Sequence, residues 1–330
     1  MSKISIAMTT YNGEKYIQSQ MESLMRQTRL PDEIIISDDC SKDHTIQLIE
    51  EVLKRYEYVT YKIIKNDKNL GYIKNFYQSI SMTSGDMIFL CDQDDIWLED
   101  KLEKMERLFE ANSGVLSLNG SFDLIDSGDK PIPYQCHRGA VNNDLLRGKY
   151  PENQMTRVPY STVLKYNISP GCTLAFRKTI RDQFLEKSRH ILPHDWEINL
   201  IAAMNNGLYF YNCPVIHYRI HEKNTLGMNT DDSISEFEFK NNIDFRKAAL
   251  EDRKSLRKVA LQWSKEIPLS DDQKRSLKYV LKYDQYRMQC VFEHKFTSWF
   301  KLVYQTLRIW DGKHVRFKTL FGDFYYIWKR

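Results

Sequence analysis

Two hydrophobic patterns alternate over the first 91 residues, and this alternation constrains the fold more than any other feature. Short apolar runs typical of strands are separated by stretches whose apolar residues recur at helical spacing. The expected strands are residues 3–8, 33–37, 59–65 and 87–91, and the helices between them are residues 17–25, 43–56 and 72–80. Such a series predicts an α/β fold with a mostly parallel sheet and right-handed crossovers.

The composition agrees with a large globular domain. Hydrophobic residues make up 42% and charged residues 28% of the 330 residues, and no apolar run of about 18 residues or more predicts a transmembrane helix. The polar N-terminus reads as a strand rather than a secretory signal. Six scattered cysteines form no C-x-x-C pair, so we expect neither a zinc site nor a disulfide framework, and a reducing cytoplasm fits best.

The charge is distributed unevenly along the chain. Residues 241–330 contain 20 Lys and Arg against 10 Asp and Glu, which leaves 28 against 34 for the rest of the chain. A basic C-terminal part beside an acidic remainder indicates an anionic surface or partner for that part.

Carboxylates gather where the predicted strands end. In "FLCDQDDIWLEDK", Asp92, Asp94 and Asp95 directly follow the strand at 87–91, and further polar groups follow the first two strands. Ligands of open parallel sheets bind at this edge. Like charges this close raise one another's pKa unless a cation lies among them, so we expect Mg²⁺ or Mn²⁺ bridging to a diphosphate. Capping of a helix that starts near Leu98 is the alternative, although one Asp would suffice for that.

Four motifs in order then resemble a known family. "TTYNGEKYI", "IIISDDCSKDHT", "NLGYIKNF" and "FLCDQDDIW" resemble the inverting nucleotide-sugar glycosyltransferases of family two, whose fold is called GT-A. "ISPGCTLAFRK", "LPHDWEINLIAAMNNG" and "HYRIHEKNTLG" resemble the acceptor-side motifs of its rhamnosyltransferase-like branch. The resemblance implies a Rossmann-like GT-A catalytic domain over residues 1–234, with a nucleotide-sugar-binding half (1–112) and an acceptor-side half (113–234). Residues 235–330 read as a helical, basic and aromatic extension.

The resemblance also implies roles for the residues at the donor side. Tyr11 would lie against the nucleotide base and Thr9 would contact the base through its backbone. Asp39 would accept a hydrogen bond from the imide N–H of uracil or thymine, and Asp92 would be the first member of the D-x-D pair that binds the nucleotide. The alternatives without a functional role are that Tyr11 is a surface aromatic and that Asp39 caps the helix after Asp43.

Three further residues would carry the metal and the chemistry. The resemblance implies that Asp94, with His221 at the diphosphate or the metal, holds Mn²⁺ or Mg²⁺. Asp195 would be the general base that takes the proton of the acceptor hydroxyl. Asp195 could instead cap the apolar helix that follows it, and His221 could be an ordinary loop histidine.

The function implied is transfer of a sugar from a nucleotide-sugar to a saccharide acceptor in the synthesis of cell-surface polysaccharide. TDP-rhamnose is the first choice of donor and a UDP-hexose the second, and an acceptor on a lipid carrier is typical of the family. A non-catalytic sugar-nucleotide-binding module and a nucleotidyltransferase are the alternatives. No Gly-rich basic phosphate loop near the N-terminus supports the latter.

An aromatic stripe marks the C-terminal part. The residues that share one helical face there are Phe296, Trp299, Phe300, Val303, Leu307 and Trp310, with Lys295, Lys301 and Arg308 toward the other faces. A basic helix with Trp and Phe on its apolar side is typical of an interfacial membrane anchor, which would place the protein at the inner face of the cell membrane. The alternatives are that residues 291–330 pack on the catalytic domain or on a second copy in a homodimer.

Overall fold

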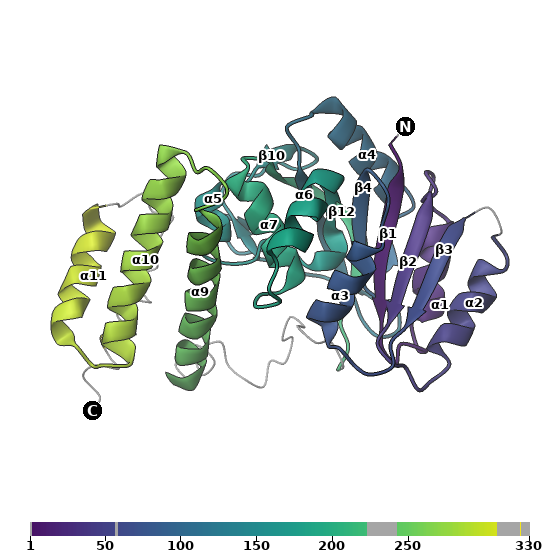
Figure 1. Cartoon of the computed structure of the whole chain (residues 1–330), viewed down its shortest axis with the longest axis horizontal. Helices are drawn as coiled ribbons and strands as arrows, with labels where there is room; N and C mark the ends of the chain where they lie inside the picture. Colours follow the sequence, from purple (N-terminus) through teal and green to yellow (C-terminus); the bar gives the residue numbers. More distant parts are fainter. Residues whose placement is uncertain (1, 57–58, 223–242, 309–323, 325–330) are drawn as a thin grey trace. The chain divides into compact units, whose positions relative to one another are not determined.

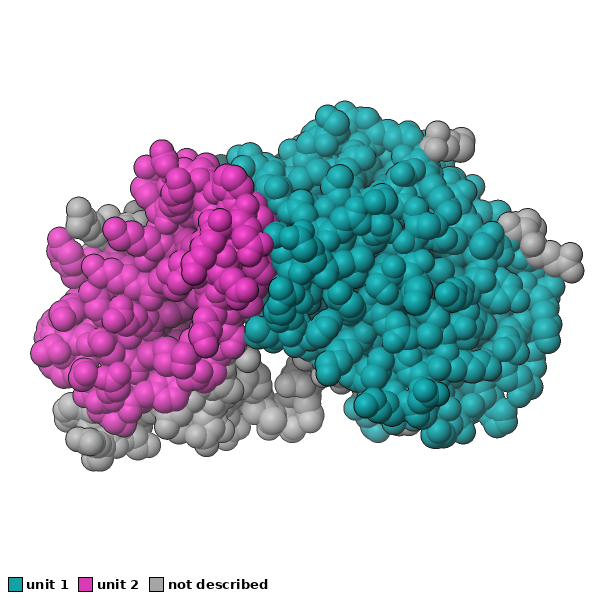
Figure 2. Space-filling view, viewed as in Figure 1, with its two compact units in different colours: residues 1–159, 167–227 teal, residues 160–166, 228–330 magenta. Residues whose placement is uncertain are grey.

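The computed structural model describes residues 2–56, 59–222, 243–308 and 324. The chain divides into two compact units, one of residues 1–159 and 167–227 and the other of residues 160–166 and 228–330 (Figure 2). The short helix α5 (Tyr160–Val163) contacts the C-terminal helix α10 and therefore belongs to the second unit.

Unit 1 begins with the parallel half of its sheet (Figure 1). The strands β1 (Ile4–Thr10), β2 (Glu33–Asp38), β3 (Thr60–Lys65) and β4 (Met87–Cys91) pair in parallel in the order β4-β1-β2-β3. The connecting helices are α1 (Ile17–Met25), α2 (Thr45–Leu53) and α3 (Tyr72–Ser81). β1, β2 and β4 are buried along their whole length, which explains their continuous apolar runs. The predicted β-α series is confirmed.

The second half of unit 1 extends the same sheet in the order β10-β12-β6-β11-β4. Its longer strands are β6 (Ser117–Ile125), β11 (Leu174–Arg177), β12 (Leu208–Arg219) and β10 (Met155–Arg157). β11 runs antiparallel to both β4 and β6, whereas β12 is parallel to β6. The helices here are α4 (Lys101–Ala111), α6 (Lys178–Lys187) and α7 (His194–Met204). The sheet is large and mostly parallel and is flanked by helices, as expected.

Short elements complete this half. β5 (Ile96–Trp97) pairs with β12, β7 (Pro131–Ile132) pairs with β6, and β8 (Ala140–Val141) pairs with β9 (Leu146–Arg147). A single 3₁₀ turn, η1 (Gly171–Thr173), leads into β11. Because β5 follows directly on the Asp92–Asp95 segment and pairs with β12, it ties that segment to β12.

Besides α5, the described part of unit 2 includes the helices α9 (Ile243–Trp263), α10 (Asp271–Val291) and α11 (Phe296–Arg308). A capping box between Ser270 and Gln273 starts α10. Between α9 and α10 lies a buried ion pair, in which Arg257 is 3.1 Å from Asp284. α10 also packs on α11. None of the helices in the described ranges is both long enough and apolar enough to span a bilayer.

One face of α11 is buried against α10, and the aromatic residues lie on other faces of the helix. Ser298, Leu302 and Thr306 are buried, and Leu302 packs against Tyr283 of α10. Phe296, Phe300 and Tyr304, the aromatic face, lie 42%, 56% and 66% exposed. Trp299 and Val303 are half-buried, while the side chain of Leu307 and all of Trp310 lie outside the described residues. Phe324 packs on Phe296 with ring centroids 5.6 Å apart, so within the part of the chain described Phe300 and Tyr304 form the most exposed part of the aromatic face.

Candidate active site

The ends of β1, β2 and β4 are joined by hydrogen bonds. Thr10 Oγ1 donates to Asp38 Oδ2 over 2.7 Å, and the Asp39 N–H donates to the Thr10 carbonyl over 2.8 Å. Gln93, the middle residue of the D-x-D sequence, accepts from the Tyr11 N–H (2.7 Å) and donates to the Tyr11 carbonyl (3.1 Å). The ring of Tyr11 stays 48% exposed. Thr9, Tyr11, Asp39 and Asp92 thus lie at one edge of the sheet, as expected from strand ends.

Asp39 organises a loop rather than a helix start. Its buried carboxylate accepts from the N–H groups of Leu70 (2.7 Å) and Gly71 (2.9 Å) and from Asn66 Nδ2 (3.1 Å). Gly71 has φ 79°, a conformation that favours glycine, and it precedes α3. The alternative that Asp39 caps α2 is wrong, because Asp43 accepts from the Thr45 N–H there.

Half-buried Asp92 and buried Asp95 belong to one cluster. One oxygen of each carboxylate and the Cys172 sulfur lie within 4.8 Å of one another. Burial raises the pKa of Asp92 well above its usual value, and the charges of Asp95, Asp94 and Asp195 raise it further. Burial, with the Asp94 charge, raises the pKa of Asp95 to about 7. The Asp95 carboxyl would therefore be fully ionised near neutral pH only if positive charge were added.

A buried lysine lies beneath this cluster. Lys101, the first residue of α4, is fully buried, and its Nζ donates to the Cys172 carbonyl over 2.6 Å and lies 3.3 Å from the centroid of the Trp97 ring. Burial lowers the pKa of Lys101 to about 8. Asp100, not the Asp92–Asp95 segment, precedes α4, so the helix-cap alternative for the carboxylate cluster is wrong.

Asp94 points to a different partner. Its Oδ2 lies 2.9 Å from His221 Nε2, which follows the end of β12. The His221 ring stacks on Tyr16 with ring centroids 4.9 Å apart. The pair of residues assigned to the metal, Asp94 and His221, is thus brought into contact from positions 127 residues apart.

Arg219 fixes this arrangement. It is 1% exposed, its Nε donates to the Asp94 carbonyl over 2.6 Å, and its backbone N–H donates to Asp95 Oδ1 over 3.1 Å. The guanidinium also lies 4.6 Å from the centroid of the Tyr16 ring. Arg219 therefore holds the Asp92–Asp95 segment against the end of β12.

Asp195 lies in the first turn of α7, close enough to Asp92 for its charge to raise the pKa of Asp92. Pro193 occupies the N-cap, so the cap alternative for Asp195 is wrong. Asn167 Nδ2 donates to Asp195 Oδ2 over 2.6 Å, and the Trp196 N–H donates to Oδ1 over 2.8 Å. Burial raises the pKa of Asp195 to about 6, against 3.8 in ordinary surroundings. A carboxylate of this kind is ionised at neutral pH yet accepts a proton readily.

His194, the residue before Asp195, packs into the core. It is 5% exposed, stacks on Phe76 with ring centroids 3.9 Å apart, and burial lowers its pKa to about 3, so the ring is neutral. A Cβ added at Gly171 would lie 3.2 Å from His194 Nε2 and 3.4 Å from Asp195 Cβ. The glycine of "SPGC" therefore lets η1 approach the start of α7 closely.

These residues suit a divalent cation bound through oxygen. The carboxylates of Asp92, Asp94 and Asp95 are the oxygen ligands that Mg²⁺ and Mn²⁺ prefer, and His221 adds one imidazole nitrogen. Burial and the charges of neighbouring carboxylates raise the pKa values of Asp92 and Asp95, and a bound cation would offset both effects. The donor set therefore fits the expected metal, with Asp94 and His221 in mutual contact and Asp92 and Asp95 behind them.

A family comparison decides the classification. The family model described as "Glycosyl transferase family 2" matches residues 5–182, which is 178 of the 330 residues. The chain belongs to glycosyl transferase family 2. As a family 2 glycosyltransferase it is an enzyme that transfers a sugar from a nucleotide-sugar, and the resemblance noted from its motifs is confirmed.

Two curated relatives carry more specific names. The dTDP-rhamnosyl transferase RfbG of Shigella flexneri is 28% identical over 241 residues, covering 67% of this chain and 74% of that protein. A glucosyltransferase of Escherichia coli, WfgD, is 26% identical over 222 residues, covering 66% of this chain and 78% of its own length. WfgD is named for transfer from UDP-Glc to α-D-GlcNAc-diphosphoundecaprenol.

Solved structures show the same fold. Residues 1–349 of TarS from Staphylococcus aureus, in complex with UDP-GlcNAc, align with a TM-score of 0.52 and 14% identity over 93% of this chain and 88% of that one. A mannosyltransferase from Pyrobaculum calidifontis, in complex with GDP-Man and Mn²⁺, aligns with a TM-score of 0.50 and 12% identity over 100% of this chain and 88% of that one. At these identities the likeness concerns the fold, which is GT-A.

Proposed function

We propose that this enzyme is a metal-dependent inverting glycosyltransferase whose general base is Asp195. The observation that carries the proposal is the environment of Asp195. A buried carboxylate with pKa about 6 lies beside the D-x-D carboxylates and is oriented by Asn167. This is the proton acceptor that an acceptor hydroxyl needs next to a diphosphate leaving group.

The donor site is formed by the sheet edge. Tyr11 offers an exposed ring to the base, Thr9 its backbone, and Asp39 its carboxylate to the imide N–H while it holds the loop before α3. Asp92 lies on the diphosphate side. Because Gln93 ties the Tyr11 backbone to the D-x-D segment, base and diphosphate contacts are held at a fixed separation.

Asp94 and His221 would hold Mn²⁺ or Mg²⁺, with Asp92 beside them. When bound, such an ion offsets the negative charge that develops on the departing nucleoside diphosphate. Arg219 and Tyr16 position the two ligands from behind.

The reaction is a single displacement. The acceptor hydroxyl oxygen attacks the anomeric carbon while its proton passes to an Asp195 oxygen. The bond from the anomeric carbon to the diphosphate oxygen breaks on the opposite face, and its electron pair leaves with the nucleoside diphosphate. One displacement inverts the anomeric configuration and needs no covalent intermediate on the enzyme.

The relatives support a choice of substrates. Similarity to a dTDP-rhamnosyl transferase favours dTDP-rhamnose as donor, with a UDP-hexose second. Similarity to an enzyme named for a diphosphoundecaprenol-linked acceptor favours a lipid-linked saccharide in cell-surface polysaccharide synthesis, at the cytoplasmic face of the membrane.

A thermal-shift screen tests the donor site. We expect dTDP and UDP to raise the melting temperature in the presence of Mn²⁺, and GDP to have a smaller effect, because ligands that bind the folded state stabilise it. A guanine base presents no single imide donor flanked by two carbonyls to Asp39. Equal shifts with all three nucleotides would remove Asp39 as the base-reading group, and no shift with any would remove the donor site.

We propose in addition that the aromatic face of α11 inserts into the interface of an anionic membrane. Its three rings are exposed on a helix in a basic part of the chain. Replacing Phe296, Phe300 and Tyr304 together by serine should weaken co-sedimentation with vesicles on the order of a hundredfold, on neutral and anionic vesicles alike. A variant that binds vesicles as the wild type does would contradict this membrane contact. If, in addition, the sedimentation coefficient of the free variant changes, the aromatic face belongs to a homodimer interface.

A further inference from the structure

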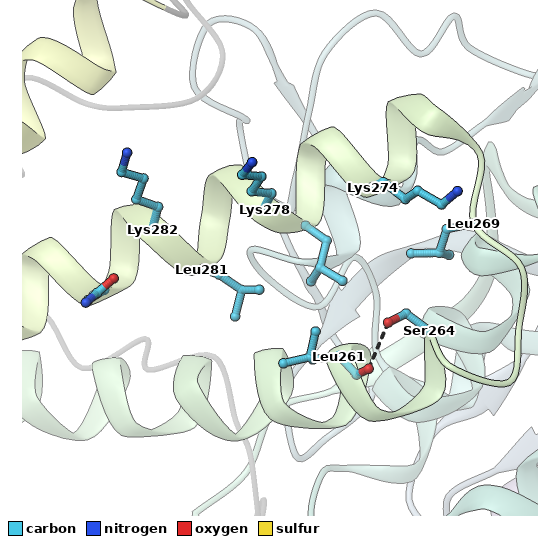
Figure 3. A pocket seen from close by; sticks show the side chains of 9 residues that line it. Leu261, Ser264, Leu269, Lys274, Lys278, Leu281 and Lys282 are labelled. Carbon is cyan, nitrogen blue, oxygen red and sulfur yellow. Dashed lines mark hydrogen bonds between the residues drawn. The ribbon is translucent and has the colours of Figure 1, made fainter.

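An open groove of about 720 Å³ lies between α9 and α10 in unit 2 (Figure 3). Its apolar floor consists of four leucines, Leu261, Leu269, Leu277 and Leu281. Leu269 and Leu277 are buried, whereas Leu261 is 46% exposed. The groove is formed by α9, α10 and the loop between them, and none of its lining residues is assigned to sugar transfer.

One side of the groove carries a row of positive charge. Lys274, Lys278 and Lys282, the lysine row, follow one another at four-residue spacing along α10 and are all among the residues that line the groove. Figure 3 shows the amines of Lys278 and Lys282 pointing away from Leu261 and Leu281, so their charge lies at the outer rim of the groove. Lys274 lies 3.7 Å from Asp271, and Lys282 lies 5.8 Å from the centroid of the Tyr286 ring. No carboxylate of the described residues forms an ion pair with Lys278 or Lys282.

This row has no evident structural purpose. Like charges four residues apart on a helix disfavour the helix slightly. The start of α10 is already stabilised by its capping box and by Asp271 and Asp272 in the first turn. A row of cations along an apolar groove instead has the complementary chemistry of an anionic amphiphile.

We propose that this groove binds an anionic phospholipid of the membrane, with an acyl chain along the leucine floor and the phosphate at the lysine row. Two other occupants, residues 309–330 of this chain and a second copy of the chain, are disfavoured because each would bring more positive charge to the lysine row. Residues 309–330 of this chain carry five Lys and Arg against two Asp and Glu. A second copy joined through the same patch by a twofold axis would bring two lysine rows together. The site goes beyond the proposed sugar transfer and is independent of it.

The test is co-sedimentation of the full chain with phosphatidylcholine vesicles that contain or lack phosphatidylglycerol, without nucleotide. The variant has all three residues of the lysine row replaced by glutamine. Since each basic residue near an anionic leaflet contributes about fivefold, the variant should bind phosphatidylglycerol vesicles on the order of a hundredfold more weakly. Its binding to pure phosphatidylcholine should not change.

The matched control removes the same charge elsewhere in unit 2, by Lys254→Gln, Lys258→Gln and Lys265→Gln. These lysines are exposed and do not line the groove. Equal weakening by both triple variants would overturn the site, as would a wild type that ignores phosphatidylglycerol. Should the triple variant unfold, Lys278→Gln alone is expected to lose about fivefold, and no loss overturns the proposal.

A second variant tests the apolar floor. Leu261→Asp places a negative charge at the exposed leucine and should also weaken binding to phosphatidylglycerol vesicles, with the sedimentation coefficient of the free protein unchanged. If Leu261→Asp instead converts a dimer to a monomer while vesicle binding persists, the groove is a self-association surface and the proposal fails.

Discussion

Replacing Asp195 by asparagine should make the protein more stable and nearly inactive. Loss of the proton acceptor is expected to lower transfer by about 10²- to 10⁴-fold while nucleotide binding persists. The stability gain follows from burial. A carboxyl with pKa about 6 in the folded chain and 3.8 elsewhere costs about 3 kcal/mol of folding free energy at neutral pH. The amide keeps one of the two hydrogen bonds that the carboxylate accepts, so we expect a gain of about 2 kcal/mol.

The gain in stability of Asp195→Asn should depend on pH. A group whose folded pKa is raised favours folding below its unfolded pKa and loses that contribution as pH rises through its folded pKa. Wild type and Asp195→Asn should therefore differ little in urea unfolding near pH 4, and the variant should become the more stable one above pH 6 or so. A variant less stable than wild type at neutral pH would mean that hydrogen bonds or positive charges stabilise the ionised Asp195 carboxylate by more than its burial costs.

Glu197 provides the matched control. It lies in the same turn of α7, is 1% exposed, and burial raises its pKa as well. Residues two apart on a helix face different directions, so Glu197→Gln should share the stability gain and keep transfer. Loss of transfer in Glu197→Gln with retention in Asp195→Asn would exchange the two roles.

Asp94→Asn should lower transfer on the order of a hundredfold and abolish the rise in melting temperature caused by Mn²⁺. Asp92→Asn should cost less, because Asp94 is the carboxylate in contact with His221, the other residue proposed to hold the metal. Asp182→Asn, which changes an exposed carboxylate on α6, is the control and should leave both measurements unchanged. Transfer that survives both Asp94→Asn and EDTA would exclude a metal role for this pair.

The sequence was informative where a local pattern reflects burial directly. β1, β2 and β4 are covered on both faces, so their apolar runs predict them, and their ends predict one polar edge. The order of β6, β11 and β12 could not be predicted, because β11 is a four-residue strand inserted antiparallel between β4 and β6. That placement depends on pairing across more than 80 residues, which no local pattern records.

In the candidate site, too, some residues follow from a local sequence pattern and others depend on contacts between distant parts of the chain. Spacing from strand ends identified the carboxylates, yet Gln93 and Arg219 act through backbone contacts that only the fold creates. Lys101 lies in a stretch of the sequence rich in charged residues, and yet the fold buries it fully beneath Asp92 and Asp95. For Gly171, the close approach to His194 becomes visible only once η1 and α7 are in place.

The most direct test of the account is the release of nucleoside diphosphate from dTDP-rhamnose and from UDP-glucose. It is measured with and without an undecaprenyl-diphosphate-linked saccharide, in Mn²⁺ or EDTA, for wild type and Asp195→Asn. We predict release from one of these donors that requires acceptor and Mn²⁺ in the wild type and is lost in Asp195→Asn, which still binds the nucleotide. Acceptor-dependent release that persists at the wild-type rate in EDTA or in Asp195→Asn would contradict the account.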